Sequence, residues 1–269
     1  MNDVIFGQYY PTKSFVHNMD ARVKLLLTIA YMVMVFLIDN FYGYALAVGF
    51  IVLAVIFSRV PFLSVLRSIK GVTFLAVFTA VLNLFFYSSG EVVFEFWIIK
   101  IKDEALIMTA FMALRLFLLV LGTCLLTLTT APVDLTSAIE SVLKPLKVVK
   151  FPVESLALVM SIALRFIPTL MNEADRIIKA QKARGADFES RNIFKKAKAM
   201  LPILIPLLVS SFQRAEELAL AMDARCFKGG KGRTKYKKMK MTWRDLIGFL
   251  IVAGSITGVV LLNMHFGAV

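Results

Sequence analysis

Long runs of apolar residues alternate with short polar segments along the first half of this chain and return at its end. Five of these runs predict membrane-spanning helices, at residues 25–38, 41–57, 72–87, 105–131 and 246–266. The first run is short, and by length alone it could also be a buried helix of a soluble protein. Lys24 before it and the turn at Asp39 and Asn40 after it favour a span that returns into the second run. The pattern therefore predicts an all-α polytopic membrane protein with five transmembrane helices.

Residues 131–227 are too long for a plain connection between helices. They read as three helical pieces, of which the second (152–185) and the third (199–226) each have an apolar first half and a charged second half. Such a helix lies oblique or flat at the membrane interface and carries its polar end into water. Prolines near the junctions predict hinges, at Pro168, Pro202 and Pro206. The predicted organisation is an N-terminal membrane domain (1–130), a set of crossing coupling helices on the cytoplasmic side (131–241) and a C-terminal transmembrane helix (242–269).

The formal net charge of +13 is unevenly distributed. Residues 131–241 hold 21 basic and 10 acidic residues, whereas the loop at 88–104 carries four acids and two lysines. Because basic loops stay on the cytoplasmic side, the N-terminus is predicted to be cytoplasmic and the C-terminus extracellular, in the plasma membrane. The lysines at 228–241 are typical of an anchor on an anionic lipid bilayer. No aromatic platform accompanies them, so nucleic acid is not an expected partner.

An imperfect repeat relates the two long helical pieces. When Arg184 is aligned with Arg225, several alanines match and an Ala-Arg pair ends both pieces. Small residues at three- and four-residue spacing let two helices approach closely, which predicts a helix crossing formed by Ala174, Ala180, Ala215, Ala219 and Ala221. Each arginine could simply neutralise the negative end of its own helix. Its planar, five-donor side chain also suits bidentate capture of a carboxylate on another protein.

These residues resemble one known family, the T components, or transmembrane coupling subunits, of energy-coupling factor (ECF) transporters for vitamins and metals. The resemblance rests on the segment SFVHNMDARVKLL at 14–26, on the long helical pieces and, most specifically, on the two Ala-Arg tags. It implies that each tag docks into a groove of one of two ABC-type ATPase subunits, through Ala183, Arg184, Gly185, Ala224, Arg225 and Cys226. It also implies that the apolar halves hold a separate membrane-embedded substrate-binding subunit, through Leu158, Met160, Leu164, Ile203, Leu207 and Leu208.

The second tag departs from the family pattern, because Cys226 stands where a glycine is expected. A cysteine with positive φ is uncommon and costs roughly 1 kcal/mol or more. The sequence therefore predicts that the second helix does not end at this tag in the same way, and that it could run on to Gly229 and Gly230.

Two other classes of function stay open from the residues: a polytopic membrane enzyme acting on lipid, and a stand-alone secondary carrier. An enzyme needs an acid–base or metal cluster, and His17 with Asp20 is the only neighbouring His–carboxylate pair. A carrier predicts paired broken spans, whereas the proline breaks lie in the coupling region. The chain also has no phosphate-binding loop. ATP and magnesium are therefore expected in the partner subunits, with no cofactor in this chain.

Overall fold

The computed structural model describes residues 9–86, 92–96, 99–186, 193–227, 229 and 241–266. The chain divides into two compact units. Unit 1 comprises Met1–Ile139 and Lys238–Val269, and unit 2 comprises Glu140–Lys237. Unit 1 therefore joins the C-terminal helix to the N-terminal helices.

Helices make up almost all of the described structure. In chain order the elements are α1 (Ala21–Phe36), α2 (Phe41–Ser58), α3 (Phe62–Phe86), β1 (Val92–Phe96), β2 (Ile99–Lys102), α4 (Asp103–Thr129), α5 (Pro132–Val142), the 3-10 helix η1 (Lys144–Val149), α6 (Val153–Ala183), α7 (Ile193–Ala224) and α8 (Trp243–Phe266). β1 and β2 form a small antiparallel hairpin between α3 and α4, which the sequence pattern does not indicate. The predicted all-α class is confirmed, and the hairpin is a local addition within one loop.

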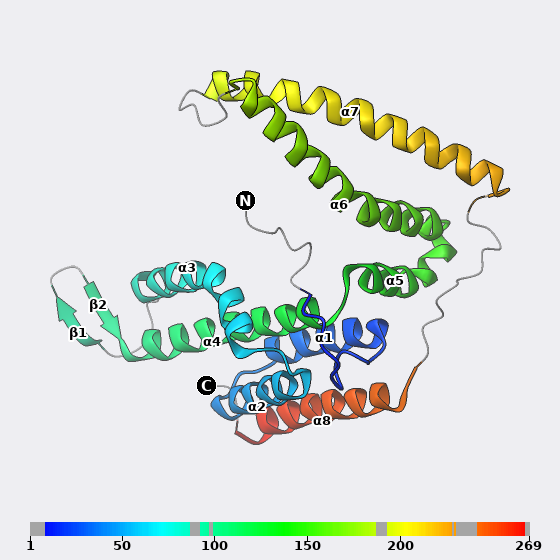
Figure 1. Cartoon of the computed structure of the whole chain (residues 1–269). Helices are drawn as coiled ribbons and strands as arrows, with labels where there is room; N and C mark the ends of the chain where they lie inside the picture. The colour runs from blue at the N-terminus through cyan, green and yellow to red at the C-terminus, as the bar shows by residue number, and fades with distance from the viewer. Residues whose placement is uncertain are drawn as a thin grey trace. The chain divides into compact units, whose positions relative to one another are not determined.

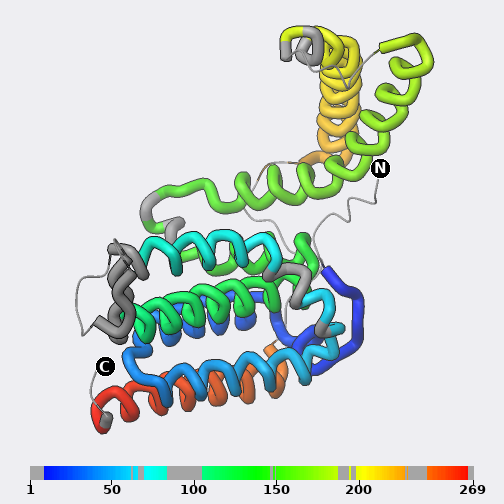
Figure 2. Tube along the Cα trace, turned by 90° about the vertical axis from the view of Figure 1, so that its left-hand side faces the viewer, coloured from blue at the N-terminus to red at the C-terminus, as the bar shows by residue number. Residues whose placement is uncertain are grey.

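α4 is the central helix of unit 1, since it packs against α1, α2 and α3, while α8 packs against α1 and α2 (Figure 1). Figure 2 shows α2 and α8 lying side by side along their length. α1 approaches α4 closely at Gly122, where an added Cβ would lie 2.7 Å from a ring carbon of Tyr31. The buried core of the unit consists of Tyr31, Met34, Val35, Ile38, Tyr44, Ala47, Ile51, Leu118 and Val259. Between helices in lipid, such a core is held by van der Waals packing rather than by removal from water.

A buried polar cluster fastens one end of unit 1. The Asp245 carboxylate, in the first turn of α8, accepts a hydrogen bond of 2.8 Å from the backbone N–H of Asp20, which caps α1. The Lys24 ammonium donates to the carbonyls of His17 (3.2 Å) and Thr129 (3.0 Å), and Thr129 is the last residue of α4. Asp20, Lys24 and Asp245 are all buried. The start of α1, the end of α4 and the start of α8 are thus joined by side chains.

A second set of side chains fastens the other end of α1. The Asn263 amide, near the end of α8, donates to the carbonyl of Leu37 (2.5 Å), and the Asn40 amide donates to the side-chain oxygen of Asn263 (3.4 Å). The Arg115 guanidinium, from the middle of α4, donates to the carbonyl of Ile38 at 2.6 Å. Arg115, which interrupts the apolar run at 105–131, therefore satisfies a carbonyl just past the end of α1. α1 and α8 run in the same direction, because their starts meet at one end and their last turns at the other.

Four described helices are long and apolar enough to cross a membrane: Phe41–Ser58, Ala105–Thr129, Val153–Ala183 and Trp243–His265. Three of them are the spans predicted at 41–57, 105–131 and 246–266. The fourth is α6, which the sequence had indicated as an interfacial helix with an apolar first half.

The other two predicted spans also form helices. The run at 25–38 lies in α1, whose 16 residues give about 24 Å of helix, short of the roughly 30 Å hydrocarbon core. The run at 72–87 lies in α3, apart from residue 87, which falls outside the described residues. All five predicted spans therefore belong to unit 1, and they form a multi-pass membrane unit with helices of unequal length.

Replacing Asp245 by alanine should destabilise unit 1, because the buried N–H of Asp20 would lose its acceptor. A buried donor left unsatisfied costs about 1–3 kcal/mol, so the Tm of the purified chain in mild detergent should fall by several degrees. The matched control is Asp39→Ala, which removes an exposed carboxylate near the other end of α1 and should leave Tm nearly unchanged. Equal losses in the two variants would contradict the role of the polar cluster.

Candidate functional site

The C-terminus of α6 is closed by a left-handed glycine. Gly185 has a φ of +86° and donates its backbone N–H to the carbonyl of Lys182 at 3.0 Å. The N–H of Ala186 reaches back to the carbonyl of Gln181, also at 3.0 Å. This pair of reversed bonds is the Schellman motif, which satisfies carbonyls that the end of a helix leaves without partners. Arg184 occupies the last position before the glycine.

α7 ends in the same motif, and the prediction that it would run on past its tag is wrong. Cys226 has a φ of +55°, and its N–H donates to the carbonyl of Asp223 at 2.8 Å. The N–H of Phe227 donates to the carbonyl of Met222 at 3.0 Å. These two bonds offset the steric cost of positive φ at a cysteine. Phe227 and Met222 also stand at the two positions where an apolar contact often accompanies the motif.

The two arginines are therefore presented in the same way. Each lies at the C-cap of a long helix, and the carbonyls of its own last turn are bonded by backbone N–H groups instead of by its guanidinium. Ala183, Arg184 and Gly185 are exposed, and so are Ala224, Arg225 and Cys226. Within the part of the chain that the structure describes, neither arginine forms an ion pair with a carboxylate. The guanidinium groups of both arginines are therefore available to bind a carboxylate on another molecule.

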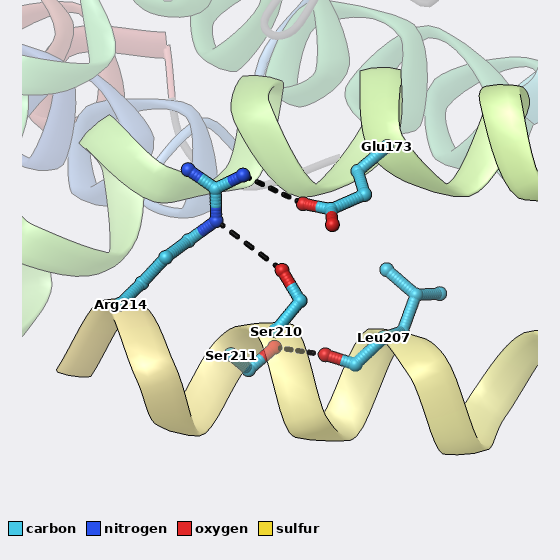
Figure 3. A network of polar contacts seen from close by, with 5 residues as sticks. All are labelled: Glu173, Leu207, Ser210, Ser211 and Arg214. Carbon is cyan, nitrogen blue, oxygen red and sulfur yellow. Dashed lines mark hydrogen bonds and ion pairs between the residues drawn. The ribbon is translucent and has the colours of Figure 1, made fainter. Parts of the chain in front are cut away.

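α6 and α7 are linked by an ion pair at the point where they meet (Figure 3). The Arg214 guanidinium donates to the Glu173 carboxylate with an N–O distance of 2.7 Å. Its Nε atom also donates to the hydroxyl of Ser210 at 3.4 Å, one turn earlier on α7. The side chains of Glu173 and Arg214 are 25% and 37% exposed, so the pair lies on a partly solvated surface.

The two partners of this ion pair occupy equivalent positions in the repeat. Glu173 and Arg214 are separated by 41 residues, which is also the separation of Arg184 from Arg225. Equivalent residues touch each other where two related elements meet on a two-fold axis. Each arginine tip follows its own partner of the ion pair by eleven residues, or about 16 Å of helix. The contact therefore divides the two helices so that both tips stand at the same distance from it.

The alanines predicted to form the crossing are not packed between these helices in this chain. Ala180, Ala215, Ala219 and Ala221 are exposed, and Ala174 alone of the five is half-buried. A charged pair marks the meeting point instead. The sequence does carry a signal for this meeting point, because the equivalent positions of the repeat hold the opposite charges of Glu173 and Arg214. The matched alanines, in contrast, do not indicate where the helices meet.

The predicted hinge prolines lie inside continuous helices. Pro168 belongs to α6, and Pro202 and Pro206 belong to α7. Both views draw a bend partway along α6, whereas α7 is drawn without a comparable bend (Figures 1 and 2). A proline inside a helix is the common cause of such a bend, and Pro168 is the proline that α6 contains.

The six apolar residues predicted to hold a substrate-binding subunit differ in exposure. Leu208 is 59% exposed, while Leu158, Met160, Leu164 and Leu207 are half-buried. Ile203 is 8% exposed, and its burial within the chain leaves it unavailable to a partner on this surface. Large exposed apolar side chains that the sequence pattern did not single out lie nearby on α6 and α7, namely Val159, Leu204, Ile205, Val209 and Phe212.

The His17 and Asp20 pair does not form a catalytic arrangement. The Asp20 carboxylate accepts from the backbone N–H of Arg22 at 3.0 Å, as the cap of α1. The His17 ring bonds the Ser14 hydroxyl (2.7 Å) and the carbonyl of Tyr10 (2.9 Å), and burial lowers the pKa of this imidazole. Both side chains are used to hold the turn before α1, and no group of three metal-binding side chains occurs among the described residues.

The two helix ends should respond to substitution in opposite directions. Gly185→Ala should destabilise the end of α6 by about 1 kcal/mol, and Cys226→Gly should stabilise the end of α7 by a similar amount, because only glycine adopts positive φ without strain. Hydrogen exchange of the amides at 181–186 and 222–227 measures each end separately. Changes of the same sign at both ends would contradict the shared motif.

Comparisons with known proteins place the chain in a family. A family model described as "Cobalt transport protein" matches residues 12–236. The energy-coupling factor transporter transmembrane protein EcfT of Clostridium kluyveri is 48% identical over 251 residues, which are 93% of each chain. The proteins of the same name from Thermosediminibacter oceani and Bacillus subtilis are 46% and 43% identical, over 95% and 94% of this chain and 98% and 97% of their own lengths. The resemblance inferred from the tags is therefore confirmed, and the chain belongs to the family of energy-coupling factor transporter transmembrane proteins.

Proposed function

We propose that this chain couples ATP-driven motion to substrate uptake in an ECF-type ABC importer of a vitamin or another micronutrient. In this proposal two ABC-type ATPase subunits bind ATP and magnesium, and a separate membrane subunit binds the substrate. The observation that carries the proposal is that two related helices end in the same backbone motif, each with an exposed arginine. The names of the relatives, which describe a transmembrane protein of an energy-coupling transporter, support the same reading.

The tags suit docking into a groove for steric and electrostatic reasons. Arg184 and Arg225 each follow an alanine, and Gly185 follows Arg184, so little side-chain bulk surrounds the guanidinium. A planar guanidinium pairs bidentately with a carboxylate, and such pairs are strong when a groove excludes water. Because the backbone at each tip is held by two reversed hydrogen bonds, docking orders little additional chain.

The ion pair between Glu173 and Arg214 supplies a pivot for this motion. Closure of the ATPase pair would displace the two arginine tips relative to each other. With both tips the same distance from the contact, the displacement becomes a rotation of α6 and α7 about it, a rigid-body change. The apolar halves beyond the contact, which expose Leu208 and Phe212, would then tilt the substrate-binding subunit that rests on them.

The same proposal orients the chain with its N-terminus in the cytoplasm and its C-terminus outside. α1 and α8 run in the same direction, so the starts of both helices face one side of the membrane. That side carries Arg22, Arg59 and Arg244, in agreement with the excess of basic residues expected in cytoplasmic segments.

Reversing the charge of both tips should abolish coupling without unfolding the membrane helices. In the variant Arg184→Glu with Arg225→Glu, the docking carboxylates would be repelled, so ATPase copurification and substrate uptake should both fall to background. The matched control is Lys198→Glu, an exposed position on α7 away from the tips and from the ion pair of Glu173 and Arg214. Full uptake by the double variant would refute the proposal.

Reversing the charge of one partner at the pivot should impair coupling and leave docking intact. Glu173→Arg or Arg214→Glu alone places like charges at the contact, at a cost of about 1 kcal/mol, and should reduce uptake about fivefold. The exchanged pair, Glu173→Arg with Arg214→Glu, should recover uptake because the two positions are equivalent. Uptake and ATPase copurification would be measured on the same preparations. An exchanged pair as defective as the single variants would show that the contact is no pivot.

A further inference from the structure

Two cavities of different chemistry adjoin at one end of unit 1. The first, of about 160 Å³, lies among α1, α2, α4, α8 and the segment before α1. The second, of about 450 Å³, is lined by Lys13, Ser14 and Asn18 before α1, by the end of α2, and by Arg244 of α8. Phe15 and Phe57 line both cavities, and their ring centroids are 6.3 Å apart. The two cavities therefore share a wall of aromatic side chains.

The second cavity is basic. Among the described residues, Lys13, Arg59 and Arg244 line it and no carboxylate does, and the Arg244 guanidinium lies 5.9 Å from the ring centroid of Phe15. Within the described residues, none of the three cations forms an ion pair with a carboxylate. The neighbouring carboxylates of Asp20 and Asp245 accept backbone N–H groups instead. Three cations therefore face one cavity, and no carboxylate among the residues that the structure describes compensates their charge.

Arg59 is held in a backbone conformation that suits glycine better. It caps the end of α2 with a φ of +53°, and its N–H donates to the carbonyl of Ile56 at 3.2 Å. Positive φ is unfavourable for any side chain that has a Cβ. An arginine kept at such a position, with its side chain lining the basic cavity, suggests a use for the guanidinium beyond ending the helix.

The first cavity is lined mainly by apolar side chains, and the four side chains there that carry a polar group all bond a carbonyl. The Lys24 ammonium is bonded to two carbonyls, the hydroxyls of Thr28 and Thr129 each donate to a carbonyl of their own helix, and the Tyr31 hydroxyl donates to the carbonyl of Leu118. An apolar cavity near this size stays dry and takes up apolar molecules. Leu53 and Ile251, which also line it, are about half exposed, so the cavity reaches the surface that faces lipid.

We propose that the two cavities together bind one anionic phospholipid of the membrane leaflet at this end. The phosphate lies among Lys13, Arg59 and Arg244, and one acyl chain enters the apolar cavity past Phe15 and Phe57. An anionic headgroup matches the uncompensated charge. A lipid, rather than a free anion, matches the dry apolar cavity beside it.

The test uses the full-length chain, purified in mild detergent and analysed by native mass spectrometry with added dioleoyl phosphatidylglycerol or dioleoyl phosphatidylcholine. One phosphatidylglycerol should be retained, and phosphatidylcholine should be retained about tenfold less, since a charge-assisted contact contributes about a factor of ten. Arg59→Gly and Arg244→Gln should each lower phosphatidylglycerol retention about tenfold. Equal retention of the two lipids by the unmodified chain would overturn the proposal.

Two further variants test whether lipid retention depends on the cations of the basic cavity in particular and on the space in the apolar cavity. Lys70→Gln removes an exposed cation that lines neither cavity and should retain the lipid as the unmodified chain does. Ala54→Phe fills the apolar cavity and should lose phosphatidylglycerol with all cations in place. Arg59→Gly also relieves positive φ, so its Tm should be equal or higher while its lipid retention falls. Unchanged retention in Arg59→Gly or Ala54→Phe, or displacement of the lipid by glycerol phosphate at equal concentration, would overturn the proposal.

Discussion

In hydrocarbon, a backbone N–H or C=O group without a partner is expensive, so the ends of membrane helices must be satisfied from within the protein. Unit 1 meets this constraint with side chains that reach from one helix to the end of another. Asp245 of α8 serves the start of α1, Arg115 of α4 serves its end, and Lys24 of α1 serves the end of α4. Each of these charges thereby stabilises the fold of unit 1. This explains why Arg115 interrupts an apolar run and why Lys24 and Asp245 directly precede two others.

The exposed helix ends of unit 2 are satisfied differently, and the proposed function of the tips rests on that difference. α6 and α7 end in reversed backbone hydrogen bonds, so no side chain is required to satisfy their last carbonyls. Arg184 and Arg225 are consequently left exposed at the tips, with guanidinium groups available to a partner. An arginine that bonded the carbonyls of its own helix would have fewer donors for a carboxylate on another subunit. The backbone motif thus leaves both arginines available for the docking role proposed above.

The apolar pattern predicted the helices of unit 1 and the two long helices of unit 2, since periodicity and length are local properties of the sequence. The partners of the polar residues were not predictable in this way. Nothing near Arg115 in sequence indicates that it bonds the carbonyl of Ile38, because that contact depends on how α1 and α4 pack. Residue type alone predicts that positive φ at Cys226 is unfavourable. The two hydrogen bonds that offset this cost depend on how the end of α7 folds. Periodicity and residue type therefore predicted the helices, whereas the partners of the polar side chains depend on how those helices pack.

The contact between Glu173 and Arg214 is a partly exposed ion pair, and a weak contact of this kind suits the pivot proposed above. A partly exposed ion pair contributes about 0–1 kcal/mol, whereas breaking a fully buried pair costs about 3–5 kcal/mol. A buried pair would therefore hold α6 and α7 at one angle against the force of an attached partner. In the proposed motion, the partly exposed pair would exchange with water while the helices turn, and its position would still be the one where equivalent residues face each other. The two arginine tips lie at the same distance from the ion pair because Glu173 and Arg214 occupy equivalent positions in the repeat. The strength of the ion pair does not affect this distance.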